Sequence, residues 1–435
     1  MSKRSMYKNN LVIGLALIFQ SCGYQTSTLK SQLDESNSSL RPIPEYEDSS
    51  YVVISGGLDV SLIDKFQEYL PKQGVKLISI GKKPQKEDVN TISIPMEKAF
   101  LSPNMWARDW GAISVKEYDN VSQVAFTYEG ASRSKDAAFL AADAISMDIK
   151  RPKLKLSSGD EYDFIFEGGN FMSDGEDCVM TDKPVRDMIL TLYGKEILSQ
   201  SSGLAQSQRL AMIQKVIESK INSSEGIQIK EDVKKYFREE LGCKRTIMTD
   251  KTPHEGTNHI DLWAKFIDKK TVLVHYIPDE RFNQVLPMLT SSRRRKLTDI
   301  KLYLDNNIRK FENLGYKVIP VKMATPLFAT VKAYISDTES YDVDTTEWLS
   351  TLNMLFVVNG QSKVAYIPDY REATDIEIDF VNTSERVYTD LELFPKYKGE
   401  LTRILESYGF QSFYLDTDGL VGTGGSIHCV TMQIP

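Results

Sequence analysis

The chain has 435 residues, of which 41% are hydrophobic and 26% are charged, as is typical of a soluble globular protein with a substantial core. The formal net charge of −7 argues against nucleic acid as a partner, because a surface that binds nucleic acid needs an excess of Lys and Arg. The histidines and cysteines lack the spacing of a metal site and there is no phosphate-binding glycine loop, so the sequence predicts no metal and no organic cofactor.

Residues 1–22 are typical of a bacterial export signal. Basic residues precede an apolar run at 11–19, which is too short to span a membrane, and Cys22 follows in a context of small residues. This pattern predicts cleavage, lipid attachment at Cys22 and a membrane-anchored lipoprotein in the periplasm or at the cell surface, with no other contact to a membrane. Phe19 and Gln20 depart from the usual lipoprotein signal, so secretion without a lipid is the alternative.

The remaining chain divides into a linker and one large domain. Residues 23–47 are rich in Ser, Thr, Gln and Asn, which predicts a flexible tether. Residues 48–435 are predicted to form the folded domain. Strand-like and helical patterns alternate from residue 51 onwards, which indicates α/β architecture. These patterns fall at 51–55, 60–70, 76–80, 272–277, 302–315, 317–322, 354–358, 363–367, 396–409 and 411–415.

A stretch at about 184–242 differs from this alternation, because it reads as three successive helices at 185–200, 204–220 and 230–241. We interpret it as an insert that adds a helical layer at the surface; the alternative is a lid or cap that selects the substrate. Cys178 and Cys243 flank it. Two buried free thiols are favoured over a disulfide, because free cysteine packs readily as a small hydrophobic residue.

The candidate nucleophile is Cys429, which follows a glycine pair and Ser-Ile-His near the C-terminus. Glycine lets the backbone approach a ligand closely. His259, Asp261, Glu167 and Asp109 supply an imidazole and three carboxylates. One carboxylate suffices for a Cys–His pair in acyl transfer, whereas two more would weaken the thiol unless the substrate is cationic. A guanidinium is such a cation, and its N–H fork pairs with carboxylates.

Four segments resemble the guanidine-modifying (pentein) superfamily, in particular the Porphyromonas-type peptidylarginine deiminases and the agmatine deiminases. They are MWARDWGAI at 105–113, FEGGNFMSDG at 166–175, GTNHIDLWAKFID at 256–268 and GTGGSIHCVTMQIP at 422–435, in the order of that family. A weaker match lies at 352–360. The resemblance implies a five-bladed α/β propeller of ββαβ modules with the site at its axis, and a cofactor-free deiminase.

The resemblance also implies catalytic roles. Cys429 attacks the guanidinium carbon and forms a covalent amidino intermediate. His259 protonates the departing ammonia and then activates water. Glu167 holds the imidazole tautomer, as the carboxylate of a triad does. Asp109 and Asp261 grip the guanidinium nitrogens. The His-x-Asp spacing places both side chains on one face of a predicted strand.

Three further residues are carried over as substrate-binding. Trp106 offers an indole face to the guanidinium. Asn353 matches an asparagine of the family near its site. Arg133 is the one arginine in the loop where the peptidylarginine branch holds a terminal carboxylate. His428 precedes the nucleophile, so its side chain is expected to point away from the pocket, without a role.

The substrate follows from the predicted address. An exported protein meets arginine-containing peptides and proteins, so the prediction is conversion of peptidyl arginine to citrulline (citrullination) with release of ammonia. The alternative is a small guanidine, as in an agmatine deiminase of putrescine biosynthesis. Two rivals remain: an amidinotransferase, and a lipoprotein that binds guanidines without catalysis. The sequence predicts no particular oligomeric state.

Overall fold

The computed structural model describes residues 39–55, 58–81, 88–95, 105–128, 136–200, 206–334, 340–370, 394–417, 420 and 425–435. The export signal with Cys22, the first part of the predicted tether and Arg133 lie outside these residues, so the corresponding expectations stay predictions. Within these ranges, the helices are all too short or too polar to cross a membrane.

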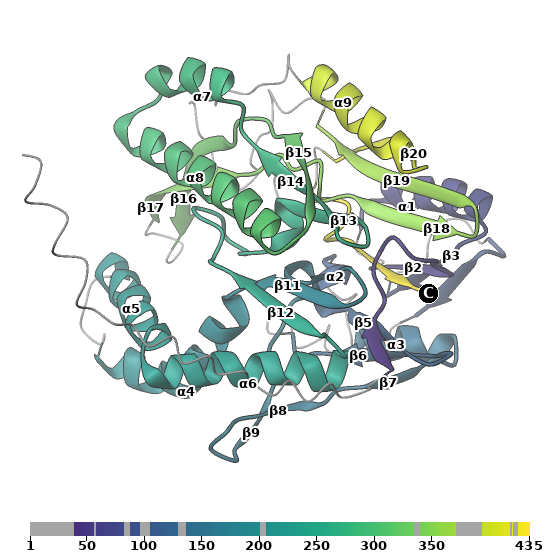
Figure 1. The fold of residues 1–435 in the computed structure, drawn as a ribbon, viewed down its shortest axis with the longest axis horizontal. Helices are drawn as coiled ribbons and strands as arrows, with labels where there is room; N and C mark the ends of the chain where they lie inside the picture. Colours follow the sequence, from purple (N-terminus) through teal and green to yellow (C-terminus); the bar gives the residue numbers. More distant parts are fainter. Residues whose placement is uncertain are drawn as a thin grey trace, which may run out of the picture. The chain divides into compact units, whose positions relative to one another are not determined.

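Five sheets of the described chain repeat one pattern of strand pairing (Figure 1). In each sheet a first strand runs antiparallel to a second, and the second runs parallel to a third. Helices connect the second strand to the third, because parallel neighbours need a long crossover. The α/β prediction is therefore confirmed in the form of a repeated β-β-α-β unit.

The first three sheets, in pairing order, are β21 (Thr431–Ile434), β2 (Tyr51–Ser55), β3 (Lys76–Ile80) and β4 (Thr91–Ile94); β1 (Leu40–Pro42), β5 (Ala112–Glu117), β6 (Asn120–Ala125) and β7 (Asp148–Lys150); β10 (Met172–Ser173), β11 (Asp177–Thr181) and β12 (Arg245–Thr249). The other two are β13 (Ala264–Asp268), β14 (Thr271–Tyr276) and β15 (Lys317–Lys322); β18 (Leu355–Asn359), β19 (Ser362–Asp369) and β20 (Gln411–Asp416). Two hairpins, β8 (Lys153–Lys155) with β9 (Glu161–Asp163) and β16 (Leu327–Tyr334) with β17 (Ser340–Glu347), complete the strands of the described part.

The helices that connect the second and third strands are α1 (Val60–Tyr69), α3 (Ala137–Ala144), α4 (Lys183–Gln200), α5 (Gln206–Ile221), α6 (Ser224–Leu241), α7 (Asp279–Val285), α8 (Ser291–Asn313) and α9 (Phe394–Ser407). A single turn, α2 (Ala107–Trp110), precedes β5. Short 3₁₀ turns are η1 (Leu70–Gln73), η2 (Gly168–Asn170), η3 (Ile260–Leu262) and η4 (Leu286–Met288).

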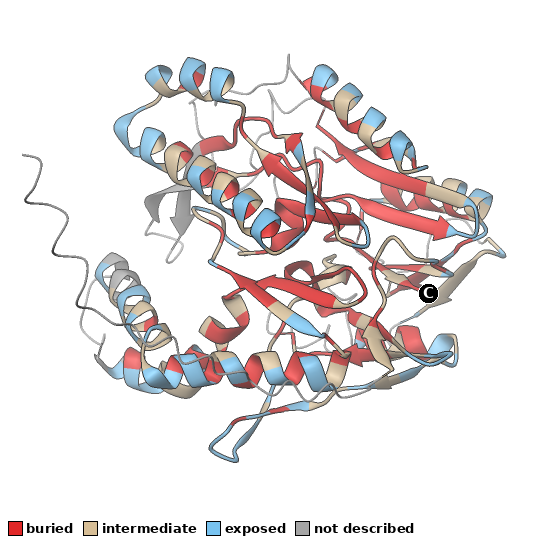
Figure 2. Ribbon diagram, in the orientation of Figure 1, coloured by how far each residue is buried: buried red, intermediate tan, exposed pale blue. Residues whose placement is uncertain are grey.

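The helices are amphipathic and the central strands are buried, as Figure 2 shows. Helix α8 keeps one face on the core, with buried residues spaced three or four apart: Leu297, Ile300, Leu304, Asn307 and Phe311. Its N-terminus is capped by Thr290, whose side chain accepts a hydrogen bond from a backbone N–H of the first turn. The helix predicted at 302–315 covers only the C-terminal half of α8, whereas the predictions for β14 and β15 beside it are confirmed.

The prediction of a flexible tether up to residue 47 is wrong for residues 39–47. Strand β1 pairs antiparallel with β5, and Arg41 forms an ion pair with Glu47 at 2.8 Å. The chain then continues over the domain, where the backbone N–H of Ser49 donates to the carbonyl of Val358. We call residues 39–50 the strap. Its polar composition resembles a linker, but its backbone hydrogen bonds are made to the domain, so it is an integral part of the fold.

The three helices predicted in the insert are present as α4, α5 and α6, but they are more than a surface layer. Phe237 of α6 is fully buried and contacts the rings of Phe166 and Phe171, which flank the turn containing Glu167. The insert therefore packs against the residues on either side of the Glu167 turn. This contact could not be read from the periodicity, which shows only that a helix has an apolar face.

The expectation of two free thiols is wrong, because Cys178 and Cys243 form a disulfide. Cys178 lies on β11, and Cys243 immediately precedes β12, the parallel neighbour of β11. The pairing of these strands brings the two Cα atoms to 5.7 Å, within the range that a disulfide needs. The bond closes a loop with a sequence separation of 65 residues, which contains all three helices of the insert.

We predict that replacing both cysteines, Cys178→Ala with Cys243→Ala, lowers the free energy of unfolding by up to about 4 kcal/mol, since the unfolded chain regains the freedom of a long loop. Chemical denaturation of the wild type with and without reductant measures the same quantity. The matched control is Cys429→Ser, which leaves the disulfide in place. Equal stability of the double variant and the wild type would contradict a stabilising role for this bond.

Candidate active site

The residues of the predicted site that the structure describes share one position in the repeated unit: each lies a few residues before the first strand of one of the five sheets. They are Asp109 before β5, Glu167 before β10, His259 and Asp261 before β13, Asn353 before β18 and Cys429 before β21. Five equivalent turns, far apart in the sequence, thus each contribute polar side chains. The contacts below show which of these side chains meet.

The thiol of Cys429 is buried and held by Asn353. The Asn353 side-chain N–H donates to Cys429 Sγ at 3.2 Å, and its Oδ1 accepts from the backbone N–H of His428 at 3.1 Å. On the other side, the backbone N–H of Arg108 donates to the Cys429 carbonyl at 3.0 Å. The loop that carries Cys429 is therefore held by two of the other turns. Among the described cysteines Cys429 is the one with a free thiol, and it is buried.

The imidazole of His259 lies between two carboxylates. Its Nε2 is 2.8 Å from Glu167 Oε2, and its Nδ1 is 3.8 Å from Asp109 Oδ1. The expected strand is wrong here: His259 has extended backbone, but the chain turns at once into η3, which contains Asp261. The turn separates the two side chains, so His259 faces Glu167 while Asp261 faces the thiol.

Glu167 is bound from two directions. Besides His259 it meets Lys183, the first residue of α4, with Nζ 3.3 Å from its Oε2. Burial alone would raise the pKa of Glu167, but the hydrogen bond and charge of His259, with Lys183, lower it to about 2. Glu167 is therefore ionised at neutral pH, and the insert supplies one of the cations that keep it so.

Asp109 and Asp261 each have a buried oxygen that accepts no hydrogen bond in the described structure, although Asp109 Oδ1 lies 3.8 Å from His259 Nδ1. Asp261 Oδ2 is 3.8 Å from Cys429 Sγ. Within the part of the chain that the structure describes, the Oδ1 atoms of Asp109 and Asp261 are buried and accept no hydrogen bond. Leaving a charged group unpaired in this way is costly. Two such carboxylates beside a thiol indicate a site that is completed by a donor-rich cation.

The electrostatics of the site keep the free thiol protonated. Burial and the carboxylates of Asp261 and Asp109 raise the pKa of Cys429 well above its usual range. Burial would lower the pKa of His259, but Asp109 and the other carboxylates raise it to about 10. Burial, with its carboxylate neighbours, raises the pKa of Asp109 to about 7. At neutral pH the site thus holds a thiol and an imidazolium.

Glycines are required where turns approach closely. A Cβ on Gly169 would lie 2.4 Å from His259 Nδ1, and a Cβ on Gly168 would lie 2.2 Å from the carbonyl oxygen of Arg108. A Cβ on Gly425 would lie 2.2 Å from the ring of Trp106. The glycines before the nucleophile therefore make room for an indole at the site, in addition to any ligand.

The two tryptophans differ in their surroundings. Trp106 is partly buried and packs over Gly425, four residues before the nucleophile, so its ring lies beside the site. Trp110 is buried in the core with Ala107 and Met432. The structure thus places Trp106 where a substrate could contact it and assigns Trp110 to packing.

A cavity of about 330 Å³ adjoins the turns of His259 and Cys429. Its lining residues are Glu255, Leu262, Glu347, Trp348, Tyr370, Gly425 and Ser426. Glu255 accepts hydrogen bonds from the backbone N–H groups of Thr257 and Asn258, which lead into His259. Two carboxylates therefore line a space next to the reacting groups. Among the described residues there is no group of three or more His, Cys, Asp or Glu side chains arranged to hold a metal.

Sequence reasoning missed Lys183 and a buried charged network behind Asp261. His428 was expected to point away from the pocket without a role, but its Nδ1 is 2.6 Å from Asp261 Oδ2, so it contacts a carboxylate of the site. Glu45, Arg108 and Lys265 continue this network. Arg108 and His428 lie inside the matching segments and could have been singled out there. Glu45 carried no such signal, because the composition of the strap is that of a linker.

We predict that Gly169→Ala lowers the free energy of unfolding by about 1–3 kcal/mol, since the new methyl group collides with the buried ring of His259. Gly399→Ala is the control: the same methyl group meets no atom within 4 Å there, and Ala favours the helix by about 1 kcal/mol. Denaturant unfolding of both variants measures the difference. A Gly169→Ala variant as stable as the wild type would contradict the close approach.

Comparison with known proteins agrees with this geometry. The profile of the Porphyromonas-type peptidyl-arginine deiminase family matches residues 60–187. A search of curated protein sequences finds no significant match. Among solved structures, an agmatine deiminase of C. jejuni is similar over 91% of this chain and 96% of its own, with 15% identity and a TM-score of 0.55.

Two more solved structures share the fold over 91% of this chain. They are a Porphyromonas gingivalis protein provisionally described as an arginine deiminase (98% of its chain, 16% identity, TM-score 0.56) and an agmatine deiminase of Enterococcus faecalis (96%, 16%, 0.51). The profile match and the shared α/β fold confirm that this chain resembles the Porphyromonas-type peptidyl-arginine deiminases and the agmatine deiminases of the guanidine-modifying superfamily.

Proposed function

We propose that this protein is an amidine hydrolase that removes ammonia from a guanidinium group. The observation that carries the proposal is the pair of buried carboxylate oxygens, on Asp109 and Asp261, that lack hydrogen-bond partners beside the thiol of Cys429. A guanidinium would satisfy both through its N–H fork and would neutralise their repulsion. A neutral substrate would not supply the N–H donors and the positive charge that these two oxygens lack.

The chemistry follows from the charges of the site. Binding of the cation lowers the pKa of Cys429, and the thiol proton leaves to solvent. The thiolate attacks the guanidinium carbon, and His259, present as imidazolium, protonates the departing ammonia. This forms a thioether-linked amidinium on Cys429. Neutral His259 then takes a proton from water, and the hydroxide adds to the same carbon. The C–S bond breaks to regenerate the Cys429 thiolate, and the product loses its O–H proton to solvent to become a neutral ureido group. Glu167 keeps the ring oriented throughout.

For the substrate we propose arginine within or at the end of a peptide, which becomes citrulline. The Cys178–Cys243 disulfide supports this choice indirectly, because disulfides persist in the oxidising compartments where an exported enzyme meets peptides. The second candidate is agmatine, favoured by Glu255 and Glu347 in the adjoining cavity, where a second cation would find opposite charge. Agmatine deiminases are also among the structures with this fold.

We propose further that the five sheets surround the site as the blades of a propeller. Two observations support the arrangement. Each sheet has the same order of antiparallel and parallel pairing, and the turn before each first strand carries a site residue. Contacts among those turns, such as Asn353 with Cys429 and Glu167 with His259, bring the equivalent ends of several sheets together.

The first functional prediction concerns charge. Chloroacetamidine, which is cationic, should alkylate Cys429 at pH 7 at least about tenfold faster than chloroacetamide, its neutral isostere, a difference of about 1.4 kcal/mol. The neutral reagent should react faster as pH rises, because the pKa of the thiol is raised. Mass spectrometry of the Cys429 peptide measures both rates.

The matched variants are Asp109→Asn and Asp261→Asn. Removing one negative charge should slow alkylation by the cationic reagent, because the site attracts a cation less strongly. It should accelerate alkylation by the neutral reagent, because the pKa of the thiol falls. The ratio of the two alkylation rates should therefore fall, because the cationic reagent becomes slower and the neutral reagent becomes faster. If the variants keep the preference of the wild type, the carboxylates do not face the ligand.

The second functional prediction is ammonia release. The mature protein should release ammonia from an arginine peptide, with kcat/KM for agmatine lower, and chelator should leave the rate unchanged. Cys429→Ser and His259→Ala should each lower activity at least about a hundredfold, because the nucleophile and the acid–base group act together and loss of either one disables both. An added amine acceptor should change nothing; transfer to it would indicate an amidinotransferase.

Each other outcome has a reading. Agmatine preferred by more than about tenfold would make the agmatine deiminase the correct assignment. Tight binding of arginine peptides without ammonia release would favour a non-catalytic binding protein. Loss of activity in chelator would show that the set of catalytic groups is incomplete.

A further inference from the structure

His428 bridges two carboxylates, those of Asp261 and Glu45. Its Nδ1 is 2.6 Å from Asp261 Oδ2, and its Nε2 is 2.7 Å from Glu45 Oε1. The ring of His428 and the side chain of Asp261 are fully buried. The backbone N–H of His428 donates to Asn353, so His428 is held through its backbone as well as through its ring.

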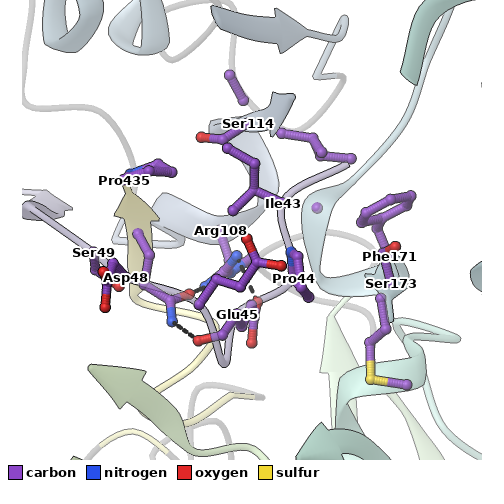
Figure 3. A pocket seen from close by; sticks show the side chains of 16 residues that line it. Ile43, Pro44, Glu45, Asp48, Ser49, Arg108, Ser114, Phe171, Ser173 and Pro435 are labelled. Atoms are coloured by element: carbon purple, nitrogen blue, oxygen red, sulfur yellow. Dashed lines mark hydrogen bonds and ion pairs between the residues drawn. The ribbon is translucent and has the colours of Figure 1, made fainter. Parts of the chain in front are cut away.

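The far end of this bridge is supplied by the strap. Glu45 Oε1 also meets Arg108 Nη1 at 2.9 Å, and Glu45 Oε2 forms an ion pair with Lys265, which is buried. Figure 3 shows Glu45 and Arg108 on the wall of a cavity of about 580 Å³ that opens to solvent. Glu45 keeps 21% of its side chain exposed there, whereas the Asp261 end of the bridge has no exposure.

Each ring nitrogen of His428 faces a carboxylate oxygen. Ionised carboxylates only accept hydrogen bonds, and each nitrogen of a neutral imidazole is either a donor or an acceptor. Both nitrogens of His428 lie within hydrogen-bond distance of a carboxylate oxygen. Both contacts are favourable together when both nitrogens carry hydrogen. Arg108 and Lys265 compensate Glu45, so the buried charges alternate in sign.

The bridge distinguishes the two carboxylates of the site. The Oδ2 atom of Asp261 is occupied by His428, and its Oδ1 is left without a partner in the described structure. Burial would raise the pKa of Asp261, but His428 outweighs it and lowers that pKa. Asp109 has no such support from behind, and its pKa is raised to about 7. One carboxylate is thus held ionised and in a fixed orientation before substrate binds.

We propose that Glu45 and His428 are positioning residues: the strap holds His428 as an imidazolium, which orients the ionised carboxylate of Asp261 so that its free oxygen receives the substrate cation. The kinetic part of this proposal rests on the proposed function. The strap is then a component of the active site, although it lies more than 380 residues from the nucleophile in the sequence.

The kinetic test uses Glu45→Gln, which keeps the shape of the side chain and removes its charge. We expect KM for the better of the arginine peptide and agmatine to rise about tenfold, with kcat changed less than about threefold, because Asp261 binds the cation in ground and transition states alike. The control is Glu47→Gln, two residues along the same strap, whose side chain pairs with Arg41 instead. It should leave both constants unchanged.

A double-mutant cycle separates positioning from folding. If Glu45 acts through Asp261, then Glu45→Gln costs nothing further in the Asp261→Asn background, and the two effects are not additive. Additive effects would overturn the proposal, as would equal effects of Glu45→Gln and Glu47→Gln. The rate ratio of chloroacetamidine to chloroacetamide gives the same comparison without turnover.

The protonation of His428 is measured in the wild type. The result therefore does not depend on whether a variant folds. With ¹⁵N-labelled histidine, the signal of His428 is the one of four that His428→Gln removes. We expect both its ring nitrogens to carry hydrogen at pH 7, and one of them to lose it in Glu45→Gln. A singly protonated ring in the wild type would overturn the inference. This measurement holds even if no guanidine proves to be a substrate, so the two failures are distinguishable.

Discussion

The structure of this site depends on one electrostatic constraint: Asp109 and Asp261 lie near the thiol of Cys429, and Glu167 and Asp109 both lie beside His259. Like charges at this spacing raise one another's pKa unless cations lie between them. Each carboxylate meets the constraint differently. Glu167 is ionised by contact with His259 and Lys183, and Asp261 by His428. Among the described residues, the cation beside Asp109 is His259, which Glu167 shares. The incomplete compensation supports the proposal that the site binds a cation.

The repeated β-β-α-β unit explains how such a cluster is assembled. A single turn can place one or two polar side chains before a strand, and burying several carboxylates on adjacent positions of one turn would oppose folding. Here five turns each deliver one part, and each turn is rigid because the strand that follows it is buried in its own sheet. Glycines at 168, 169 and 425 allow these turns to touch. The reacting groups are thus positioned by the scaffold, and little reorganisation is needed on binding.

The cations that balance the site come from outside the family-like motifs as well as from within them. Lys183 begins the helical insert, and Glu45, which anchors His428, comes from the strap. The insert is tied at its base by the Cys178–Cys243 disulfide and packs Phe237 under the Glu167 turn. Segments that look peripheral in the sequence therefore adjust the pKa and orientation of the catalytic groups, and changes in them are expected to alter substrate binding before they alter the fold.

The sequence by itself determined the elements and the reacting groups. Helical periodicity predicted the C-terminal half of α8 and the three helices of the insert, and the motifs singled out Cys429, His259, Glu167, Asp109 and Asp261 as candidates, because both signals are local. The tertiary structure alone decided the rest. The disulfide depends on β11 lying beside β12, and the role of His428 depends on Glu45 arriving from the other end of the chain. The turn at Asp261 replaced the expected strand because His259 and Asp261 face different partners. These outcomes depend on which buried charges end up in contact, and that is a property of the folded chain, since no local pattern of residues records it.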